Sequence, residues 1–223
     1  MRACPFTILV DTAEQHPYSF HGLRADSDQK YEEFIISTIP KCLGRHPNSL
    51  GDYSFVGAEG RCHVERKSKE DFHSTVLGFT DGNHIRFRSE LENLAKLEAP
   101  LLVIECVLDD LLAEAPEHGK KPKQQNAKIL DRSVLAFMQD YRVPIYWASS
   151  RQAAMHYTFR WFYRFWEKNL KPTRNRKTKT ALLLPGLDTD PFHEPVGASP
   201  GFPQQQGASP QVSIQTPSIL DSV

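Results

Sequence analysis

The sequence has few cysteines and no long hydrophobic run. Its four cysteines, Cys4, Cys42, Cys62 and Cys106, are scattered and form no CxxC pair. Such cysteines are typical of reduced thiols in an intracellular protein and do not indicate a disulfide framework or a zinc site. No stretch approaches the roughly 18 consecutive apolar residues of a membrane span. The short N-terminal apolar run turns acidic too soon for a signal peptide, so we expect no association with a membrane.

Composition favours a single globular domain with an unevenly charged end. Hydrophobic residues make up 39% of the 223 residues and aromatic residues 10%, which is enough for one buried core. The formal net charge is zero, but residues 151–180 carry nine basic side chains and one acidic side chain. A local block of this kind indicates a polyanionic partner.

The pattern of apolar residues predicts alternating strands and helices as far as about residue 170. We expect strands at 6–10, 101–107 and 143–149, a hairpin of 49–57 with 61–67, and helices at 28–43, 68–77, 85–97, 129–141 and 151–170. Residues 114–125 are predicted to be a polar loop. These elements predict an α/β domain with a central mixed sheet flanked by helices.

The last 43 residues differ in composition from the rest. They hold seven of the 16 prolines and two copies of GASP, and they show no apolar periodicity after residue 185. We expect a disordered tail rich in Pro, Gly and Gln at 186–223, which a basic linker at 173–185 joins to the domain.

Carboxylates and a lysine are concentrated near the predicted hairpin. Glu65 and Lys67 stand two residues apart in a strand, so their side chains point to the same face. Asp52 reaches this face if the hairpin forms, and Asp11 ends the first buried strand. Clustered carboxylates bind hard cations such as Mg²⁺ together with water and phosphate, and the metal lowers the pKa of an attacking water. Lys67 would position or deprotonate that water, or stabilise the charge that builds on phosphorus.

These residue types alone also fit a solvated strand face, but the longer string is more specific. Gly-Asp-Tyr at 51–53, Glu-Arg-Lys at 65–67 and the following Asp71 resemble the signature of the XPF-type structure-specific endonucleases. The resemblance covers roughly residues 5–170. It includes ILVDTAEQ at 8–15, RFRSELENL at 86–94, LLVIE at 101–105 and VPIYWASS at 143–150.

This resemblance implies a restriction-endonuclease-like fold and Mg²⁺- or Mn²⁺-dependent hydrolysis of phosphodiester bonds in DNA. Carried over by position, Asp52 and Glu65 are the central metal ligands and Lys67 is the catalytic lysine. Asp11 and Asp71 match the outer carboxylates of the family. The implied catalytic set is Asp52, Glu65, Lys67, Arg66 and Glu14, and the implied metal ligands are Asp52, Glu65, Asp11 and Asp71.

The sequence departs from the family at two places. Ala13 stands where the family has an arginine before its glutamate, which predicts a weakened or altered nuclease. No tandem helix-hairpin-helix pattern follows Leu170. The chain therefore resembles a minimal version of the family, with the nuclease domain at residues 1–172.

The last predicted helix carries a row of basic side chains. Arg160, Arg164 and Lys168 recur every fourth residue, and Lys171 follows. Such a row fits either a solvated helix face or contacts with DNA phosphates, and we expect the phosphate contacts because a nuclease needs a surface that follows the DNA backbone.

Aromatic side chains occur nearly all around the same helix. Trp161 and Phe165 fall outside its predicted core stripe. They indicate a dimer interface, base stacking, or a helix wedged between two layers. We expect a homodimer that pairs through this region.

The sequence thus predicts a metal-dependent endonuclease that acts on branched, flapped or single-strand-bearing DNA. The alternative is a weakly active or inactive DNA-binding subunit that serves as a scaffold, and a third reading is an RNA-processing or defence nuclease. The presence of Asp52, Glu65 and Lys67 together favours the DNA nuclease. We expect an intracellular location, in the cytoplasm or nucleoid of a microbe or phage-infected cell or in the nucleus of a eukaryote.

Overall fold

The computed structural model describes most of the chain outside its C-terminal region. The described residues are 1–24, 33–45, 48–78, 82–117 and 122–172. The linker and the tail predicted at 173–223 lie outside these residues.

Six strands form the main sheet of the described residues. They are β2 (Ile8–Asp11), β4 (Thr38–Lys41), β5 (Tyr53–Phe55), β6 (Cys62–Lys67), β7 (Ala99–Ile104) and β8 (Ile145–Trp147). Their order in the sheet is β4-β2-β5-β6-β7-β8. The β2–β5 and β5–β6 pairs are antiparallel and the others are parallel, so the sheet is mixed as predicted. Two short strands, β1 (Arg2–Ala3) and β3 (Phe34–Ile35), pair outside this sheet.

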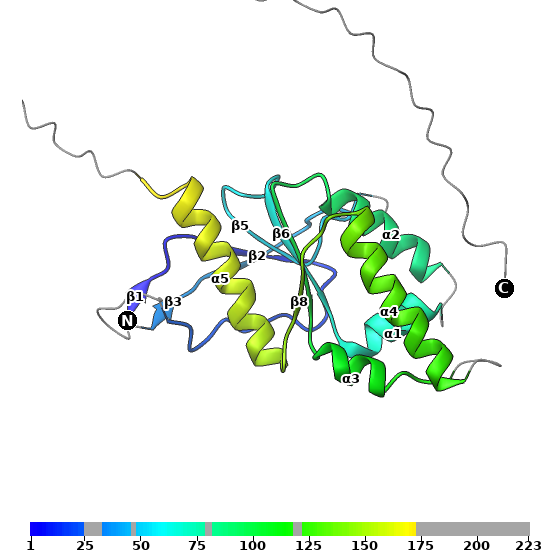
Figure 1. Cartoon of the computed structure of the whole chain (residues 1–223). Coiled ribbons are helices and arrows are strands. Elements are labelled where there is room, and N and C mark those ends of the chain that lie inside the picture. Colours follow the sequence, from blue (N-terminus) through cyan, green and yellow to red (C-terminus); the bar gives the residue numbers. More distant parts are fainter. Residues whose placement is uncertain (25–32, 46–47, 79–81, 118–121, 173–223) are drawn as a thin grey trace, which may run out of the picture. The chain divides into compact units, whose positions relative to one another are not determined.

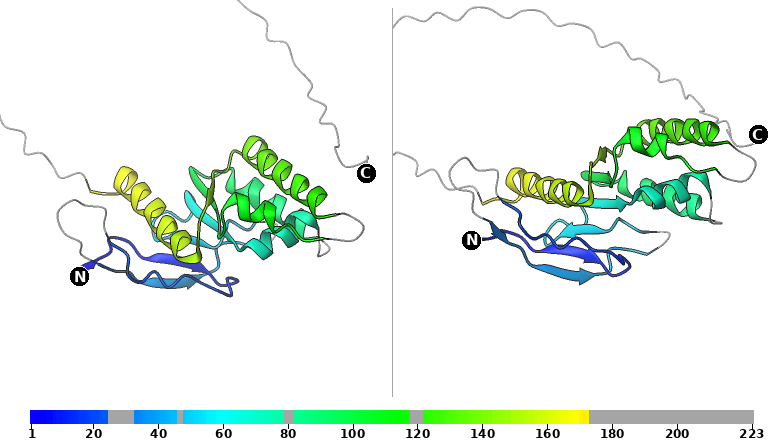
Figure 2. Two further views of the ribbon diagram at one scale, coloured as in Figure 1. Left: turned by 60° about the horizontal axis from the view of Figure 1, so that its bottom comes forward. Right: turned by 90° about the horizontal axis from the view of Figure 1, so that it is seen from below.

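Helices cover both faces of the sheet. They are α1 (Lys69–Leu77), α2 (Asn83–Leu94), α3 (Leu108–Ala113), α4 (Lys123–Asp140) and α5 (Arg151–Asn169). Figure 1 shows α5 on one side of β8 and α1, α2 and α4 on the other. Figure 2 shows the same separation of α5 (yellow) from the other helices (cyan to green). This is the predicted architecture, a central mixed sheet flanked by helices.

β7 connects the two halves of the core. Leu101 and Val103 pack into the cluster that includes α5, whereas Leu102 and Ile104 pack against the helices of the opposite face. Successive side chains of a strand point to opposite faces. A strand that is covered on both faces therefore needs a continuous hydrophobic run, and LLVI supplies it.

The helix predicted at 28–43 is wrong wherever the structure describes this segment. Its described residues include β3 and β4, and β4 pairs in parallel with β2. Phe34, Ile35 and Ile39 suggested a helical stripe, but only Phe34 is buried, whereas Ile35 and Ile39 are 57% and 49% exposed. The segment is rich in β-branched residues, which favour strands. Pro40 is compatible with β4 because this strand is at the edge of the sheet.

The remaining predicted elements are present with shifted ends. Ser68 begins the helix expected at 68–77, and its Oγ accepts a hydrogen bond from the Asp71 N–H at 3.1 Å. The predicted polar loop at 114–125 is shorter than expected, because α4 already begins at Lys123. The short helix α3 was not predicted.

The two aromatic residues that suggested a dimer interface contact the chain's own sheet. Phe165 is 6% exposed, and its ring centre lies 6.1 Å from that of Phe55. Trp161 is partly buried, and its Nε1 donates to the Ala99 carbonyl at 3.3 Å. These contacts fit the wedged-helix alternative. The homodimer stays a prediction, and Phe165 gives it no support.

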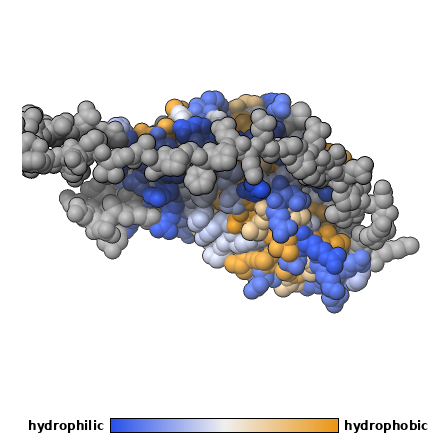
Figure 3. Space-filling view, turned by 45° about the horizontal axis from the view of Figure 1, so that its top comes forward, coloured by the Kyte–Doolittle hydropathy of each residue, from blue (hydrophilic) through white to orange (hydrophobic). Residues whose placement is uncertain are grey.

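The surface mixes hydrophilic and hydrophobic residues. On the face drawn in Figure 3, small groups of hydrophobic residues lie among hydrophilic ones. Large exposed hydrophobic side chains include Ile85 of α2 and Leu135 and Met138 of α4. Among the described residues, no helix is both long and apolar enough to span a membrane.

The substitution Phe165→Ala tests the packing of α5. Because the ring is buried, we expect its loss to lower the free energy of unfolding by about 3–5 kcal/mol. Chemical denaturation of dilute protein measures this change. The control is Leu135→Ala at a 53% exposed position, which should change stability by no more than about 0.5 kcal/mol. If Phe165→Ala left the stability unchanged and changed the oligomeric state, the packing of Phe165 against the chain's own sheet would be contradicted.

Candidate active site

A pocket of about 530 Å³ is lined by residues of β2, β6, α1 and α2 and of the loops before β5 and after β2. It contains every residue predicted to be catalytic or to bind a metal: Asp11, Glu14, Asp52, Glu65, Arg66, Lys67 and Asp71. The fold therefore brings these separate parts of the sequence to one place.

Asp52 is fixed by hydrogen bonds to the strands on both sides of it. Its N–H donates to the Val64 carbonyl at 3.0 Å, and its own carbonyl accepts from the Asp11 N–H at 2.7 Å. The carboxylate oxygen Oδ2 accepts from the Arg66 N–H at 2.8 Å. The backbone thus holds this carboxylate at the pocket.

Gly51 permits the close approach of this backbone to β6. Its φ is +101°, in the left-handed region that favours glycine. A Cβ at this position would lie 3.0 Å from the Val64 carbonyl oxygen and 3.2 Å from the Glu65 nitrogen. Steric fit therefore explains why a glycine stands at the first position of the Gly-Asp-Tyr string.

Asp52 and Glu65 form a pair of carboxylates with unfavourable electrostatics. Glu65 is only 4% exposed. Burial, and then the charge of Glu65, raise the pKa of Asp52 well above its usual range. Burial likewise raises the pKa of Glu65, although Lys67 opposes this shift. Two carboxylates in a poorly hydrated site disfavour each other's ionised form, and a cation between them would stabilise that form.

Lys67 lies on the same face of β6 as Glu65, as predicted. Its Nζ is 2.8 Å from Glu65 Oε1 and 3.7 Å from Glu90 Oε2, and it lies 5.0 Å from the centre of the Phe87 ring. Burial alone would lower the pKa of Lys67, but the charges of Glu65, Glu90 and Asp52 raise it above its usual value. The lysine therefore stays protonated in this arrangement.

Arg66 points to the opposite face of β6 and forms a separate ion-pair network. Its Nε is 3.0 Å from Glu14 Oε2, and a terminal nitrogen is 3.1 Å from Glu105 Oε2. Arg151 at the start of α5 pairs with the other Glu105 oxygen at 2.9 Å. Burial alone would raise the pKa of Glu14, but the hydrogen bond with Arg66 lowers it below its usual value. Arg66 thus ties the loop after β2 to the end of β7.

Asp11 and Asp71 lie at the pocket in different settings. The Asp11 carboxylate accepts hydrogen bonds from the N–H groups of Ala13 at 3.0 Å and Leu43 at 2.8 Å, so it stabilises the turn after β2. Asp71 is exposed in the first turn of α1. Their roles as metal ligands stay predictions.

The donor set suits a cation that takes few protein ligands. Within the described parts of the chain, no three or more His, Cys, Asp or Glu side chains are placed to hold a metal ion by themselves. Mg²⁺ is commonly bound through one or two carboxylates, with water and phosphate completing its shell. Asp52 and Glu65 provide such a pair.

Three residues of the site were missed by the sequence analysis. Glu90 is 4% exposed and contacts both Lys67 and Arg86, which also lines the pocket. Glu105 joins Arg66 to Arg151. Two features of the sequence could have indicated these residues. Glu105 is an acidic residue directly after a buried strand, and Arg86 and Glu90 have the i, i+4 spacing of an ion pair in a helix.

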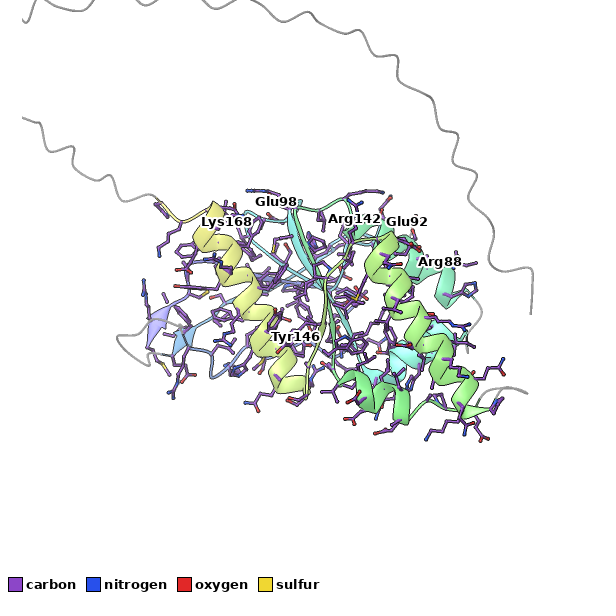
Figure 4. All side chains as sticks on the ribbon, in the orientation of Figure 1. Arg88, Glu92, Glu98, Arg142, Tyr146 and Lys168 are labelled. Atoms are coloured by element: carbon purple, nitrogen blue, oxygen red, sulfur yellow. The ribbon has the colours of Figure 1, made fainter. Side chains whose placement is uncertain are left out.

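The residues predicted to bind DNA lie apart from the pocket lining. Arg160, Arg164 and Lys168 are exposed on α5, as their spacing predicts, and Figure 4 labels Lys168. Lys171 pairs with Glu167 at 3.3 Å. Their contact with DNA stays a prediction.

Comparison with known proteins identifies the family. A family model described as the ERCC4 domain matches residues 28–160, which is more than half of the chain. The chain belongs to the ERCC4-domain family. The XPF-type resemblance of the sequence is thereby confirmed. The ERCC4 match contains Asp52, the Glu-Arg-Lys string and Asp71, whereas Asp11 and Glu14 precede it.

Two solved structures resemble this ERCC4-domain chain. XPF from Aeropyrum pernix in complex with DNA has 18% identity and a TM-score of 0.41, covering 62% of this chain and 58% of that one. XPF from Aeropyrum pernix has 17% identity and a TM-score of 0.46, covering 74% of this chain and 66% of that one. The chain thus spans less than two thirds of the length of either. A search of curated proteins gives no match.

The substitution Gly51→Ala tests the approach of Asp52 to β6. A side chain at positive φ and in contact with the β6 backbone should lower the free energy of unfolding by about 1–3 kcal/mol. The control is Gly57→Ala, which has a φ of +89° but nothing within 4 Å of the added Cβ. Thermal or denaturant unfolding should therefore show a larger loss for Gly51→Ala. Equal losses would contradict the steric role of Gly51.

Proposed function

We propose that this ERCC4-domain chain is a Mg²⁺- or Mn²⁺-dependent endonuclease that hydrolyses phosphodiester bonds in branched, flapped or single-strand-bearing DNA. The observation that carries the proposal is the meeting of Asp52, Glu65 and Lys67 in one pocket. The family, whose XPF-type members are nucleases, supports the same chemistry.

Asp52 and Glu65 would hold the metal ion. When bound, the ion offsets the charge of the phosphate and lowers the pKa of the attacking water. The hydrogen bond from the Arg66 N–H restricts the Asp52 carboxylate to one orientation. Because this donor is a backbone group of β6, it fixes the carboxylate relative to the strand.

Lys67 would act beside the metal ion as a cation. Its pKa is raised by the carboxylates around it, so it carries a proton at neutral pH. A protonated lysine can orient the attacking water by donating to it, or stabilise the charge that builds on the phosphate oxygens.

The second candidate is a weakly active or inactive DNA-binding subunit, and Ala13 is the observation that favours it. Ala13 is exposed and lines the pocket, where the family has an arginine. An arginine here would add a guanidinium able to bind phosphate or carboxylate through paired hydrogen bonds. The intact Asp52, Glu65 and Lys67 set favours the active enzyme.

Cleavage of labelled DNA tests the proposal. The panel comprises single strand, duplex, 3′ and 5′ flaps, a fork and a four-way junction, each with Mg²⁺, Mn²⁺ or EDTA. We expect metal-dependent cutting of the branched substrates, and Asp52→Ala or Lys67→Ala should lower the rate by about 100-fold or more. Asp109→Ala, at an exposed position of α3, is the control and should cut normally. Salt-sensitive DNA binding with no cutting would support the DNA-binding subunit instead.

The same cleavage assay tests whether Ala13 lowers the cleavage rate. A hydrogen bond with a charged partner contributes about 1.5–3 kcal/mol, so we expect Ala13→Arg to raise the cleavage rate by about tenfold or more. Ala13→Gln is the control for side-chain length without charge. An unchanged rate in Ala13→Arg would show that this position does not limit activity.

A further inference from the structure

The basic residues that line the pocket differ in their access to a ligand. Arg66 is buried, with 7% of its side chain exposed, and it is engaged by Glu14 and Glu105. Lys67 is 17% exposed and paired with Glu65. Arg86 is 60% exposed. Among the described lining residues, Arg86 is therefore the arginine or lysine that an incoming anion can reach most readily.

Arg86 is held by a buried carboxylate. Its Nε lies 3.2 Å from Glu90 Oε1, one helical turn further along α2. Glu90 is 4% exposed, and its Oε2 lies 3.7 Å from Lys67 Nζ. One carboxylate thus contacts two cations of the pocket through its two oxygens. A guanidinium has five N–H donors in a planar fork, so it can bind a carboxylate along one edge and a phosphate along another.

The helix that carries both residues is fixed in the core. Phe87, between Arg86 and Glu90 in sequence, is 2% exposed, and its ring centre lies 5.4 Å from that of Phe137 and 6.4 Å from that of Phe72. These contacts set the rotation of α2. Arg86 and Glu90 therefore face the pocket from a rigid element.

We infer that Arg86 contacts the phosphodiester of a DNA strand bound in the pocket, and that Glu90 is a positioning residue that holds the Arg86 guanidinium in place. The inference rests on the proposed function, because it takes a DNA phosphate as the anion. It assigns to α2 a part of the site that the Glu-Arg-Lys string does not supply.

Equilibrium binding of a labelled forked DNA in EDTA tests Arg86 without requiring cleavage. Arg86→Ala should weaken binding by about tenfold to a hundredfold and reduce the slope of log affinity against log salt by about one. Arg86→Lys keeps the positive charge, so it should show the same slope of log affinity against log salt as the wild type. The matched control is Arg88→Ala, since Arg88 is an exposed residue of the same helix outside the pocket lining (Figure 4). Equal effects of Arg86→Ala and Arg88→Ala, or no effect of either, would overturn the inference.

Glu90→Gln tests the positioning role in the same assay. Loss of a negative charge near DNA would by itself strengthen binding, so weaker binding by Glu90→Gln is the expected sign of a displaced Arg86. The weakening should disappear when Arg86→Ala is already present, because the two residues act through one contact. Glu92→Gln, at an exposed position of α2 labelled in Figure 4, is the control and should not weaken binding. Stronger binding by Glu90→Gln, or an effect that persists in the Arg86→Ala background, would overturn the positioning role.

The outcomes separate this inference from the proposed function. If the wild-type protein binds the fork but cuts no DNA, the nuclease proposal fails, and the binding variants still decide the role of Arg86. If it cuts DNA and Arg86→Ala binds and cuts like the wild type, the inference alone fails. If it binds no DNA, both fail.

Discussion

The placement of two carboxylates, Asp52 and Glu65, beside a single lysine constrains the rest of this site. Carboxylates that share a poorly hydrated pocket repel each other and disfavour their own ionisation. The chain counters this with Lys67 Nζ at 2.8 Å from Glu65 and with the Arg66 N–H at 2.8 Å from Asp52. Gly51 belongs to the same arrangement, because only a residue without a Cβ lets the Asp52 backbone approach β6 so closely.

β6 distributes consecutive charges to opposite sides of the sheet. Glu65 and Lys67 face α2, where Glu90 completes a network with Arg86. Arg66 faces α5 and joins the loop after β2 to the end of β7 through buried carboxylates. The first network contains Glu65 and Lys67, and the second contains Glu14 and Arg66. The catalytic roles of all four residues stay predictions. A single short strand thereby links the pocket to both helical layers.

Features that depend on local periodicity could be predicted from the sequence, and features that depend on distant packing could not. The two-residue spacing of Glu65 and Lys67 places them on one face in any regular strand, and a continuous apolar run marks β7 as covered on both sides. The helix expected at 28–43 failed because Ile35 and Ile39 share a helical spacing but are exposed side chains of two separate strands. Arg86 and Glu90 were missed because only the packing of α2 brings Glu90, and Arg86 with it, to Lys67 of β6.

If Asp52 and Glu65 form a cation site, binding of a metal ion should stabilise the folded protein. A ligand that binds only the folded state raises its stability, by about 2.7 kcal/mol at 100 times the dissociation constant. The measurement is the melting temperature of the wild type and of the isosteric Asp52→Asn/Glu65→Gln variant, each titrated with Mg²⁺ and Mn²⁺. We expect a melting temperature that rises with metal concentration in the wild type and does not rise in the variant. A folded wild type that shows no rise, or a variant that shows the same rise, would contradict it.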